Sequence, residues 1–401
     1  MPSLSLFPEA PPPLVGIARL ASQGESIRQG REVEYFTLPV RSLLNRCSSA
    51  RMPFAWTINP YRGCEFACKY CYARYTHEFM EMRDGADFER KIYVKQHAAD
   101  LLRQELRRVK PGEQIALGTA TDPYQPAECR YEITRGILEE FARHSGLELG
   151  IVTKSNLVLR DLEVLRHIGD HNNLSVTLTV TTMNTDLARI LEPRAPRPDL
   201  RMEAIRRLRE AGIHAGASCS PVLPGITDSV SNLEAVVRST VEAGGRYVFA
   251  NPLFLKPCSA AVFLPFLEKE FPRLVELYRQ RYRERAFVPK VYRERISQVM
   301  ARLRLKYGMR RGEEGNLSGA PPAIGPGQMA LFQDAFDPDR PRRLRSWKRD
   351  PDAVLPVADA ARSAPARPAE GAAGAVCWPG FLAPGVFPVD GPVLEAGHRG
   401  A

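Results

Sequence analysis

The sequence has no apolar stretch that approaches the roughly 20 residues needed to cross a bilayer, so it predicts no membrane span. Its first residues, MPSLSLFPEAPPPLVG, include neither a basic segment nor a long apolar run, and so they do not resemble a secretory signal. The 8 cysteines form no disulfide framework, because Cys129, Cys219, Cys258 and Cys377 stand singly. Free thiols are usual in the cytoplasm, so we expect a cytoplasmic protein without membrane contact.

The charge is concentrated in one segment. The chain of 401 residues has a net charge of +10, and residues 268–312 hold fourteen Lys and Arg against five Glu and no Asp. Tyrosines are interleaved with these cations, and Arg281 and Arg285 would share a helical face by their i,i+4 spacing. The segment is a candidate for contact with the phosphates of DNA or RNA. The alternative is a solvated helical face.

Strand-like and helix-like patterns alternate between residues 46 and 260. Strands separated by helical patterns of about 10–15 residues imply right-handed βαβ units and a parallel sheet. Six apolar strands are expected, at Phe54–Ile58, Gln114–Leu117, Leu147–Thr153, Leu174–Thr181, Ile213–Pro221 and Tyr247–Asn251.

The flanking segments differ in composition from this core. Residues 1–45 predict an irregular lead-in with a proline cluster. Residues 261–310 predict a basic helical extension with two helical patterns, Leu264–Arg285 and Tyr292–Tyr307. Residues 311–401 are rich in Pro, Ala and Gly, and we expect them to be mostly disordered because they offer little apolar surface to bury.

Three closely spaced cysteines, Cys64, Cys68 and Cys71, follow a C-x3-C-x2-C pattern with Tyr70 before the last. Three thiolates can hold three corners of a four-iron cluster, which normally takes four. The remaining iron would keep an open position, as catalytic metal sites do. The alternatives are an electron-transfer cluster or a zinc site with Cys47 as fourth ligand. Zinc sites usually show two cysteine pairs or paired histidines, which are absent near Cys47.

This motif resembles that of the radical S-adenosylmethionine (SAM) superfamily. The resemblance implies an α/β fold, a partial (β/α)6 TIM-type barrel over residues 46–260. It also implies a [4Fe–4S] cluster on Cys64, Cys68 and Cys71 whose open iron binds SAM. Reductive cleavage would release methionine and a 5′-deoxyadenosyl radical. An electron donor such as flavodoxin or ferredoxin would be required.

Further segments resemble a narrower group, the spore photoproduct lyase-like branch, also described as DNA repair photolyase-like. The resemblance covers roughly residues 35–310 and implies a lyase-like reaction in DNA repair. The segments that carry it are Asn59-Pro60-Tyr61-Arg62-Gly63, Tyr72-Ala73-Arg74, Tyr75-Thr76-His77-Glu78-Phe79 and Gly118-Thr119-Ala120-Thr121-Asp122-Pro123-Tyr124-Gln125-Pro126.

The resemblance implies a set of residues around SAM. Lys154, after the third strand, would lie near the SAM carboxylate, and the alternative is a lysine in solvent. Thr181 would reach the ribose or simply fill its strand, and Pro224 would pack on adenine or only fix a turn. The superfamily usually has a Gly-Gly-Glu motif after the second strand, which holds the amino group of SAM, and this sequence has a threonine-rich loop there instead. The cofactor-binding residues implied are Tyr70, Thr119, Thr121, Lys154, Thr181 and Pro224.

Two further motifs concern the reaction and its partners. Spore photoproduct lyase uses a barrel cysteine as hydrogen-atom donor, and no cysteine here falls on that position by motif. Cys219, between two serines of a predicted strand, is the candidate, and the alternative is a small buried thiol. In the tail, Gln328, Leu331 and Phe332 form a Gln-x-x-Leu-Phe pattern that resembles peptides binding the bacterial sliding clamp.

A hypothesis from a different class is a non-catalytic nucleic-acid-binding protein with a structural iron–sulfur or zinc site and no SAM chemistry. Structural sites are closed, whereas three cysteines leave a position open, so the pattern favours the enzyme. Formation of 5′-deoxyadenosine would separate the two hypotheses. Radical chemistry on RNA or protein is a third possibility.

Overall fold

The computed structural model describes residues 14–30, 32–47 and 53–309. All of them belong to one compact unit. In the part of the chain that the structure describes, none of the helices has the length and apolar character to cross a membrane. The tail from residue 311 onwards, with its expected disorder, lies outside the described residues. So do the clamp-motif residues Gln328, Leu331 and Phe332.

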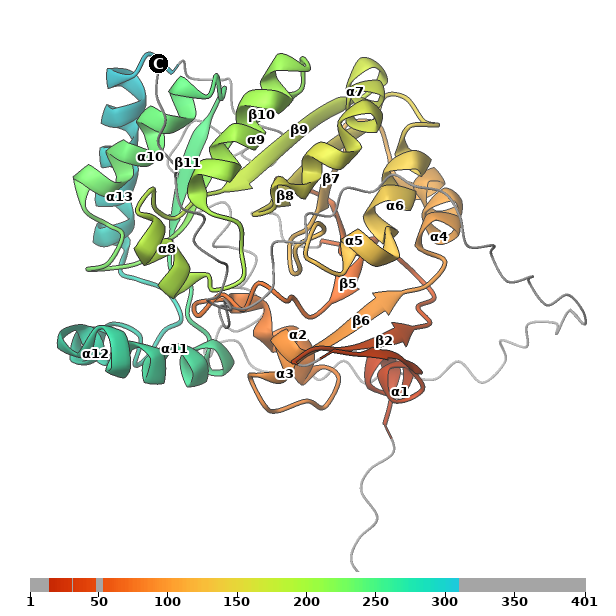
Figure 1. Ribbon diagram of the computed structural model, residues 1–401, viewed down its shortest axis with the longest axis horizontal. Helices are drawn as coiled ribbons and strands as arrows, with labels where there is room; N and C mark the ends of the chain where they lie inside the picture. Colours follow the sequence, from red (N-terminus) through yellow and green to blue (C-terminus); the bar gives the residue numbers. More distant parts are fainter. Residues whose placement is uncertain (1–13, 31, 48–52, 310–401) are drawn as a thin grey trace, which may run out of the picture. The chain divides into compact units, whose positions relative to one another are not determined.

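A seven-stranded sheet forms the centre of the described fold (Figure 1). Its strand order is β11-β10-β9-β8-β7-β4-β3. The six strands from β4 to β11 run parallel, and β3 pairs antiparallel at the edge. The strands are β3 (Asn45–Arg46), β4 (Trp56–Ile58), β7 (Gln114–Leu117), β8 (Glu148–Thr153), β9 (Asn173–Thr179), β10 (His214–Val222) and β11 (Val248–Pro252). The expected partial (β/α)6 barrel is therefore confirmed.

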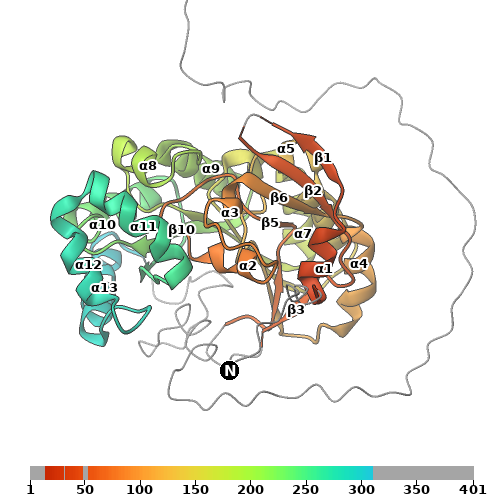
Figure 2. The same cartoon turned by 90° about the horizontal axis from the view of Figure 1, so that it is seen from below.

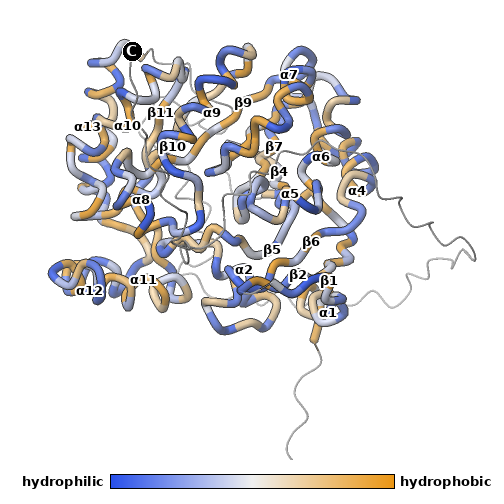
Figure 3. The backbone as a smooth tube through the Cα atoms, viewed as in Figure 1, coloured by the Kyte–Doolittle hydropathy of each residue, from blue (hydrophilic) through white to orange (hydrophobic). Residues whose placement is uncertain are grey.

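Helices between successive strands cover the sheet and share its core (Figure 1). In Figure 3, hydrophobic residues follow the strands, and both colours alternate along the surrounding helices. Leu117, Ile151 and Leu178 of the sheet pack in one buried cluster with Ile137 and Ile205 of the helices. The covering helices are α4 (Ala98–Glu105), α6 (Ile133–Phe141), α7 (Leu162–His171), α9 (Pro198–Glu210) and α10 (Val230–Glu242), with α13 (Lys290–Lys306) after the last strand. Helix α8 (Thr185–Leu191) instead packs Leu191 in a second buried cluster with Cys64 and Cys68.

The expectation of an irregular lead-in over residues 1–45 is wrong for much of that segment. The chain there forms α1 (Gly16–Ser22), β1 (Ser26–Gln29) and β2 (Glu34–Leu38). These strands join β6 (Lys91–Lys95) and β5 (Tyr61–Arg62) in a second sheet, of order β1-β2-β6-β5. Figure 2 shows β1, β2 and β6 side by side. The pairing of β2 with β6 joins segments more than fifty residues apart, so no local pattern announces it.

The helical extension after β11 is divided differently from the prediction. It contains α11 (Pro257–Glu270), α12 (Val275–Arg281) and α13. The expected helix over Leu264–Arg285 is interrupted at Phe271, whose φ of −139° is not helical. Helix α12 then ends at Arg281. Arg285 lies outside the helix, so the prediction that Arg281 and Arg285 share a helical face is wrong.

His77, in α2 (Tyr75–Glu78), is a buried imidazole whose burial lowers its pKa to about 4. It packs between the rings of Phe88 and Tyr93, and its Nε2 lies 3.2 Å from the carbonyl of Lys91. The unfolded chain binds a proton at His77 near pH 6.5, whereas the folded chain does not until about pH 4. The contribution of His77 to the free energy of unfolding is therefore fully present above pH 6.5 and is lost as the pH falls toward 4.

We expect the free energy of unfolding to fall by about 2 kcal/mol more in the wild type than in His77→Gln between pH 7 and pH 5. Urea unfolding at both pH values measures this difference. Equal losses in the two proteins would contradict a neutral buried His77.

Candidate active site

The cysteine loop begins directly after β5 and needs a glycine at its entry. Gly63 has a φ of +80°, and a Cβ there would meet the carbonyl oxygen of Lys91 at 2.6 Å. Cys64 and Cys68 are buried and Cys71 is partly buried. All three cysteines line one cavity of about 200 Å³.

Side chains from distant parts of the chain hold the backbone of this loop. Gln125 accepts a hydrogen bond from the amide of Glu65 at 3.0 Å and donates to the carbonyl of Gly63 at 3.0 Å. Arg74 Nη2 donates to the carbonyl of Cys68 at 3.1 Å. Ser259 Oγ donates to the carbonyl of Cys71 at 2.9 Å. These contacts fix the loop from several sides.

The loop after β7, at the carboxyl end of the strand, forms a second wall of the cavity. Asn59 Oδ1 accepts hydrogen bonds from the amides of Ala120 at 2.7 Å and Thr121 at 3.2 Å. Thr119 and Thr121 line the cavity together with Tyr70. The hydroxyl of Thr121, however, donates to the carbonyl of Tyr61 at 3.0 Å, so it braces the loop.

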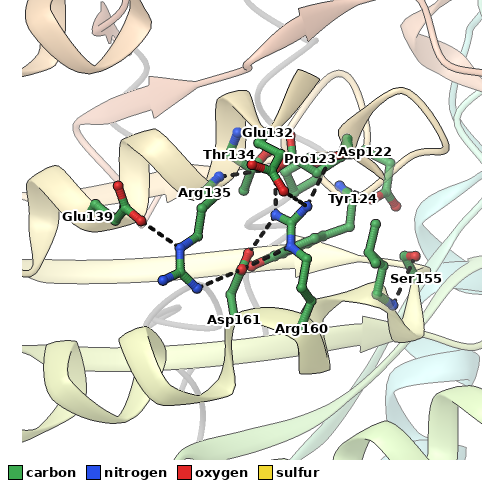
Figure 4. Close-up of polar contacts among 12 residues, drawn as sticks. Asp122, Pro123, Tyr124, Glu132, Thr134, Arg135, Glu139, Ser155, Arg160 and Asp161 are labelled. Atoms are coloured by element: carbon green, nitrogen blue, oxygen red, sulfur yellow. Dashed lines mark hydrogen bonds and ion pairs between the residues drawn. The ribbon is translucent and has the colours of Figure 1, made fainter. Parts of the chain in front are cut away.

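Asp122 is a cavity carboxylate that the sequence interpretation missed as a site residue. It accepts hydrogen bonds from Thr153 Oγ1 at 2.6 Å and from the amides of Lys154 at 2.7 Å and Tyr124 at 2.9 Å. Burial raises the pKa of Asp122, and these bonds oppose that rise. Figure 4 shows Asp122 beside the turn at Pro123 and Tyr124. Its position just after the threonine-rich strand end was the only signal in the sequence.

Lys154 lines the same cavity at the end of β8. Its Nζ lies 5.9 Å from the centre of the Tyr70 ring. Burial lowers the pKa of Lys154, but Cys68 and Glu192 outweigh that effect and leave the pKa raised. The side chain therefore carries a positive charge beside the cysteines. The aromatic residue just before the last cysteine lies beneath it.

Two of the expected cofactor-binding residues, Thr181 and Pro224, lie away from the cavity lining. The hydroxyl of Thr181 donates to Glu192 Oε1 at 3.2 Å, and Thr179 lines the cavity in its place. Pro224 is buried but does not line the cavity, whereas Pro221 does.

The prediction that Cys219 is the hydrogen-atom donor is wrong, and the alternation of side chains along the strand explains why. Ser218 and Ser220 line the cavity, so Cys219 between them faces the opposite side of β10. Its side chain is fully buried in the main hydrophobic core, and burial raises the pKa of its thiol to about 12. Cys219 is thus a structural thiol.

A neutral polar cluster forms the wall at the ends of β10 and β11, and sequence reasoning missed it. Ser220 Oγ accepts hydrogen bonds from Ser218 Oγ at 2.9 Å and Asn251 Nδ2 at 3.3 Å. All three residues line the cavity. The charged lining residues Asp122 and Lys154 lie in the loops that follow β7 and β8, so the cavity has a charged wall and a neutral wall.

The three cysteines suit a cluster better than a single ion. Among the described residues, no three His, Cys, Asp or Glu side chains are grouped closely enough to hold one metal ion. In a four-iron cluster each cysteine binds a different iron, so the sulfur atoms lie farther apart than around one ion. Cys47 packs with Phe54 and Ala116 and does not line the cavity, which removes the fourth ligand of the zinc alternative.

The fold and this cavity define a parallel β/α barrel with a cysteine-lined cavity at the carboxyl ends of its strands. The family model of the radical SAM superfamily matches residues 58–234. An uncharacterized protein of Mycobacterium tuberculosis (strain H37Rv) is 37% identical over 298 residues, which cover 73% of this chain and 86% of that protein. An uncharacterized protein of Methanocaldococcus jannaschii is 30% identical over 222 residues, which cover 55% and 78%. The chain belongs to the radical SAM superfamily.

Solved structures of spore photoproduct lyase have a similar fold. A double mutant of that enzyme with bound AdoMet and dinucleoside spore photoproduct matches with a TM-score of 0.53 and 14% identity. The match covers 68% of this chain and 79% of that one. A complex of spore photoproduct lyase with the dinucleoside photoproduct gives a TM-score of 0.52. The fold expected from the sequence resemblance is therefore confirmed.

Proposed function

We propose that this protein binds a [4Fe–4S] cluster through Cys64, Cys68 and Cys71 and reductively cleaves SAM. The observation that carries this proposal is that the three thiols share one cavity with Lys154 and Asp122. A cluster bound there would supply one electron to SAM, which breaks the C5′–S bond and yields methionine and a 5′-deoxyadenosyl radical.

The charged wall of the cavity complements SAM. Lys154 would attract the carboxylate of SAM, and Asp122 would attract its ammonium group. The three hydrogen bonds to Asp122 fix the direction of its carboxylate before SAM arrives. The aromatic rings of Phe66, Tyr70 and Tyr72 also line the cavity and would keep water from the reacting bond.

Anaerobic reconstitution with iron and sulfide tests the proposal. We expect the brown absorption of a four-iron cluster and, with a strong reductant and SAM, formation of 5′-deoxyadenosine. Lys154→Met keeps an unbranched side chain but removes the charge, so it should require more SAM for the same rate. Stoichiometric zinc without iron would contradict the proposal. A loaded cluster that yields no 5′-deoxyadenosine would support the structural-site alternative.

For the substrate we propose a nucleic acid and a lyase-like reaction related to DNA repair. The resemblance to the spore photoproduct lyase-like branch supports this, as does the position of the basic extension. Leu253 lines the cavity, and its carbonyl accepts a hydrogen bond from Tyr282 at 3.1 Å, just beyond α12. The arginine-rich extension therefore borders the site. Arg281 lies 5.1 Å from the ring of Tyr292, and Arg279 pairs with Glu268, so we assign the phosphate contacts to other exposed cations of the extension.

Arg273 and Arg285 are exposed on this extension. We expect the double variant Arg273→Ala/Arg285→Ala to weaken DNA binding and to reduce the slope of log K against log salt by about 2, because each phosphate contact adds about 0.9. Arg206→Ala/Arg207→Ala on α9 removes the same charge elsewhere and serves as the control. Fluorescence anisotropy at several salt concentrations measures both. Equal slopes in the two double variants would contradict this surface.

We also propose a cytoplasmic setting with flavodoxin or ferredoxin as electron donor, since the chemistry requires reduced thiols and one-electron delivery.

Docking on the sliding clamp through Gln328, Leu331 and Phe332 remains a proposal from the sequence. A pull-down with purified clamp, compared with a Leu331→Ala/Phe332→Ala variant, tests it. Equal retention of clamp by both proteins would contradict it.

A further inference from the structure

The segment that follows α8 runs along the cysteine loop. The amide of Lys69 donates to the carbonyl of Leu191 at 3.0 Å, and the amide of Arg194 donates to the carbonyl of Phe66 at 3.3 Å. Between these two backbone contacts stands Glu192, whose side chain reaches the loop. Residues 191–194 thus contact the loop at three points.

Glu192 is a completely buried carboxylate with a partner on each oxygen. Its Oε1 accepts hydrogen bonds from the hydroxyls of Tyr70 and Thr181, the latter at 3.2 Å. Its Oε2 lies 2.5 Å from Arg201 Nη2. Tyr70 stands between the second and third cysteines, so this carboxylate is tied to the turn that presents both.

Arg201 connects the carboxylate to the barrel. Its side chain is 1% exposed, and it extends from α9. Its Nη1 donates to the carbonyl of Thr179 at 2.9 Å, where β9 ends, and its Nε donates to the carbonyl of Pro196 at 2.8 Å. A continuous path of two hydrogen bonds and one ion pair therefore leads from β9 through Arg201 and Glu192 to Tyr70.

The charges in this path are balanced. Burial raises the pKa of Glu192, but Arg201 and Lys154 outweigh it and leave the pKa lowered, so the carboxylate is ionised. The pair of Glu192 and Arg201 is neutral as a unit. A buried pair of this kind gives little net stability compared with apolar side chains of the same volume. Its use is therefore geometric, because it fixes the direction of the Tyr70 hydroxyl.

We propose that Glu192 is a positioning residue that holds the turn from Cys68 to Cys71 in its ligating shape before any cluster binds. The significance of this shape rests on the proposed function, but the contacts belong to the protein without its cluster. The same contact keeps the Tyr70 ring in place beneath Lys154. Loss of the contact should loosen one end of the cysteine loop and leave the other end unchanged.

Amide hydrogen exchange in the cluster-free protein tests the proposal. Tyr70→Phe removes one hydroxyl and leaves the Glu192–Arg201 pair intact, so the protein should still fold. We expect the amides of Lys69 and Cys71, which flank residue 70, to exchange about tenfold faster, because one hydrogen bond to a charged group is lost. The amides of Cys64 and Glu65, bonded to the carbonyl of Phe88 and the side chain of Gln125, should not change.

Glu192→Gln supplies the second variant and a double-mutant cycle. Because Tyr70 and Glu192 act through one contact, the double variant should exchange no faster at Lys69 than the more affected single variant. Glu105→Gln is the matched control. Glu105 is another buried carboxylate, which accepts the amides of Leu43 at 2.9 Å and Leu44 at 2.8 Å.

Iron bound per chain after reconstitution is the second measurement. We expect Tyr70→Phe and Glu192→Gln to bind less iron than the wild type, while Glu105→Gln binds as much. Unchanged exchange at Lys69 in Tyr70→Phe, or equal loosening by Glu105→Gln, would overturn the inference. A wild type that binds no iron would contradict the proposed function, and the exchange data would still decide the inference.

Discussion

Replacing any one of Cys64, Cys68 and Cys71 with alanine should abolish cluster binding and the formation of 5′-deoxyadenosine. Two thiolates would leave two irons of a four-iron cluster without protein ligands, and such a cluster is lost to solvent. The three thiols line one cavity, and other parts of the chain hold the loop backbone. The expected result is therefore loss of the cofactor with little change in fold.

Iron and sulfide analysis with product chromatography measures this effect, and circular dichroism reports the fold. Cys258→Ala is a demanding control, because Cys258 precedes the serine that donates to the Cys71 carbonyl but does not itself line the cavity. It should retain cluster and product. A variant at Cys64, Cys68 or Cys71 with wild-type iron and product would contradict the ligand set.

Arg160→Met should lower the free energy of unfolding by about 3–5 kcal/mol, since it leaves two buried carboxylates without their shared cation. Arg160 Nη2 lies 2.7 Å from Glu128 Oε1 and 2.9 Å from Asp161 Oδ2, and both carboxylates are fully buried. Figure 4 shows Arg160 beside Asp161. Arg135 Nη1 remains 3.2 Å from Asp161 Oδ1 and balances the charge of Asp161, but not that of Glu128. Burial raises the pKa of Glu128, and the hydrogen bonds from Tyr61 and Arg160 oppose that rise.

This destabilisation should reach the active site. Tyr61 donates to Glu128 Oε2 at 2.5 Å, and the carbonyl of Tyr61 accepts the hydroxyl of Thr121 in the cavity wall. Urea unfolding measures the loss. Arg206→Met is the matched control, because Arg206 also contacts two carboxylates but lies on the surface, so its unfolding should change little. Similar effects of both substitutions would contradict the dependence on burial.

The barrel could be predicted because its signals are local. Buried parallel strands appear in sequence as short apolar runs, and Gln114–Leu117 was predicted with the bounds that the structure gives. The cysteine motif is equally local, and its three residues do meet in one cavity. Lys154 was found because functional groups follow parallel strands at their carboxyl ends.

The remainder depends on contacts between distant segments. Strand alternation places Ser218 and Ser220 together, but the sequence does not tell which face of β10 meets the cavity, and Cys219 was therefore misplaced. Gln125 and Asn59 look like ordinary loop residues until their partners are known. The second sheet was missed for the same reason, because its strands pair across a long separation in sequence.

The contacts that shape the cysteine loop also set an order in time. A ribosome makes the loop early, at residues 64–71, but its supports include Gln125, Glu192 and Ser259. The hydrogen bond from Ser259 to the carbonyl of Cys71 spans 188 positions. The loop is thus among the first parts of the barrel to be synthesised and among the last to gain its native contacts. An emerging chain exposes its three cysteines well before it can hold them in place.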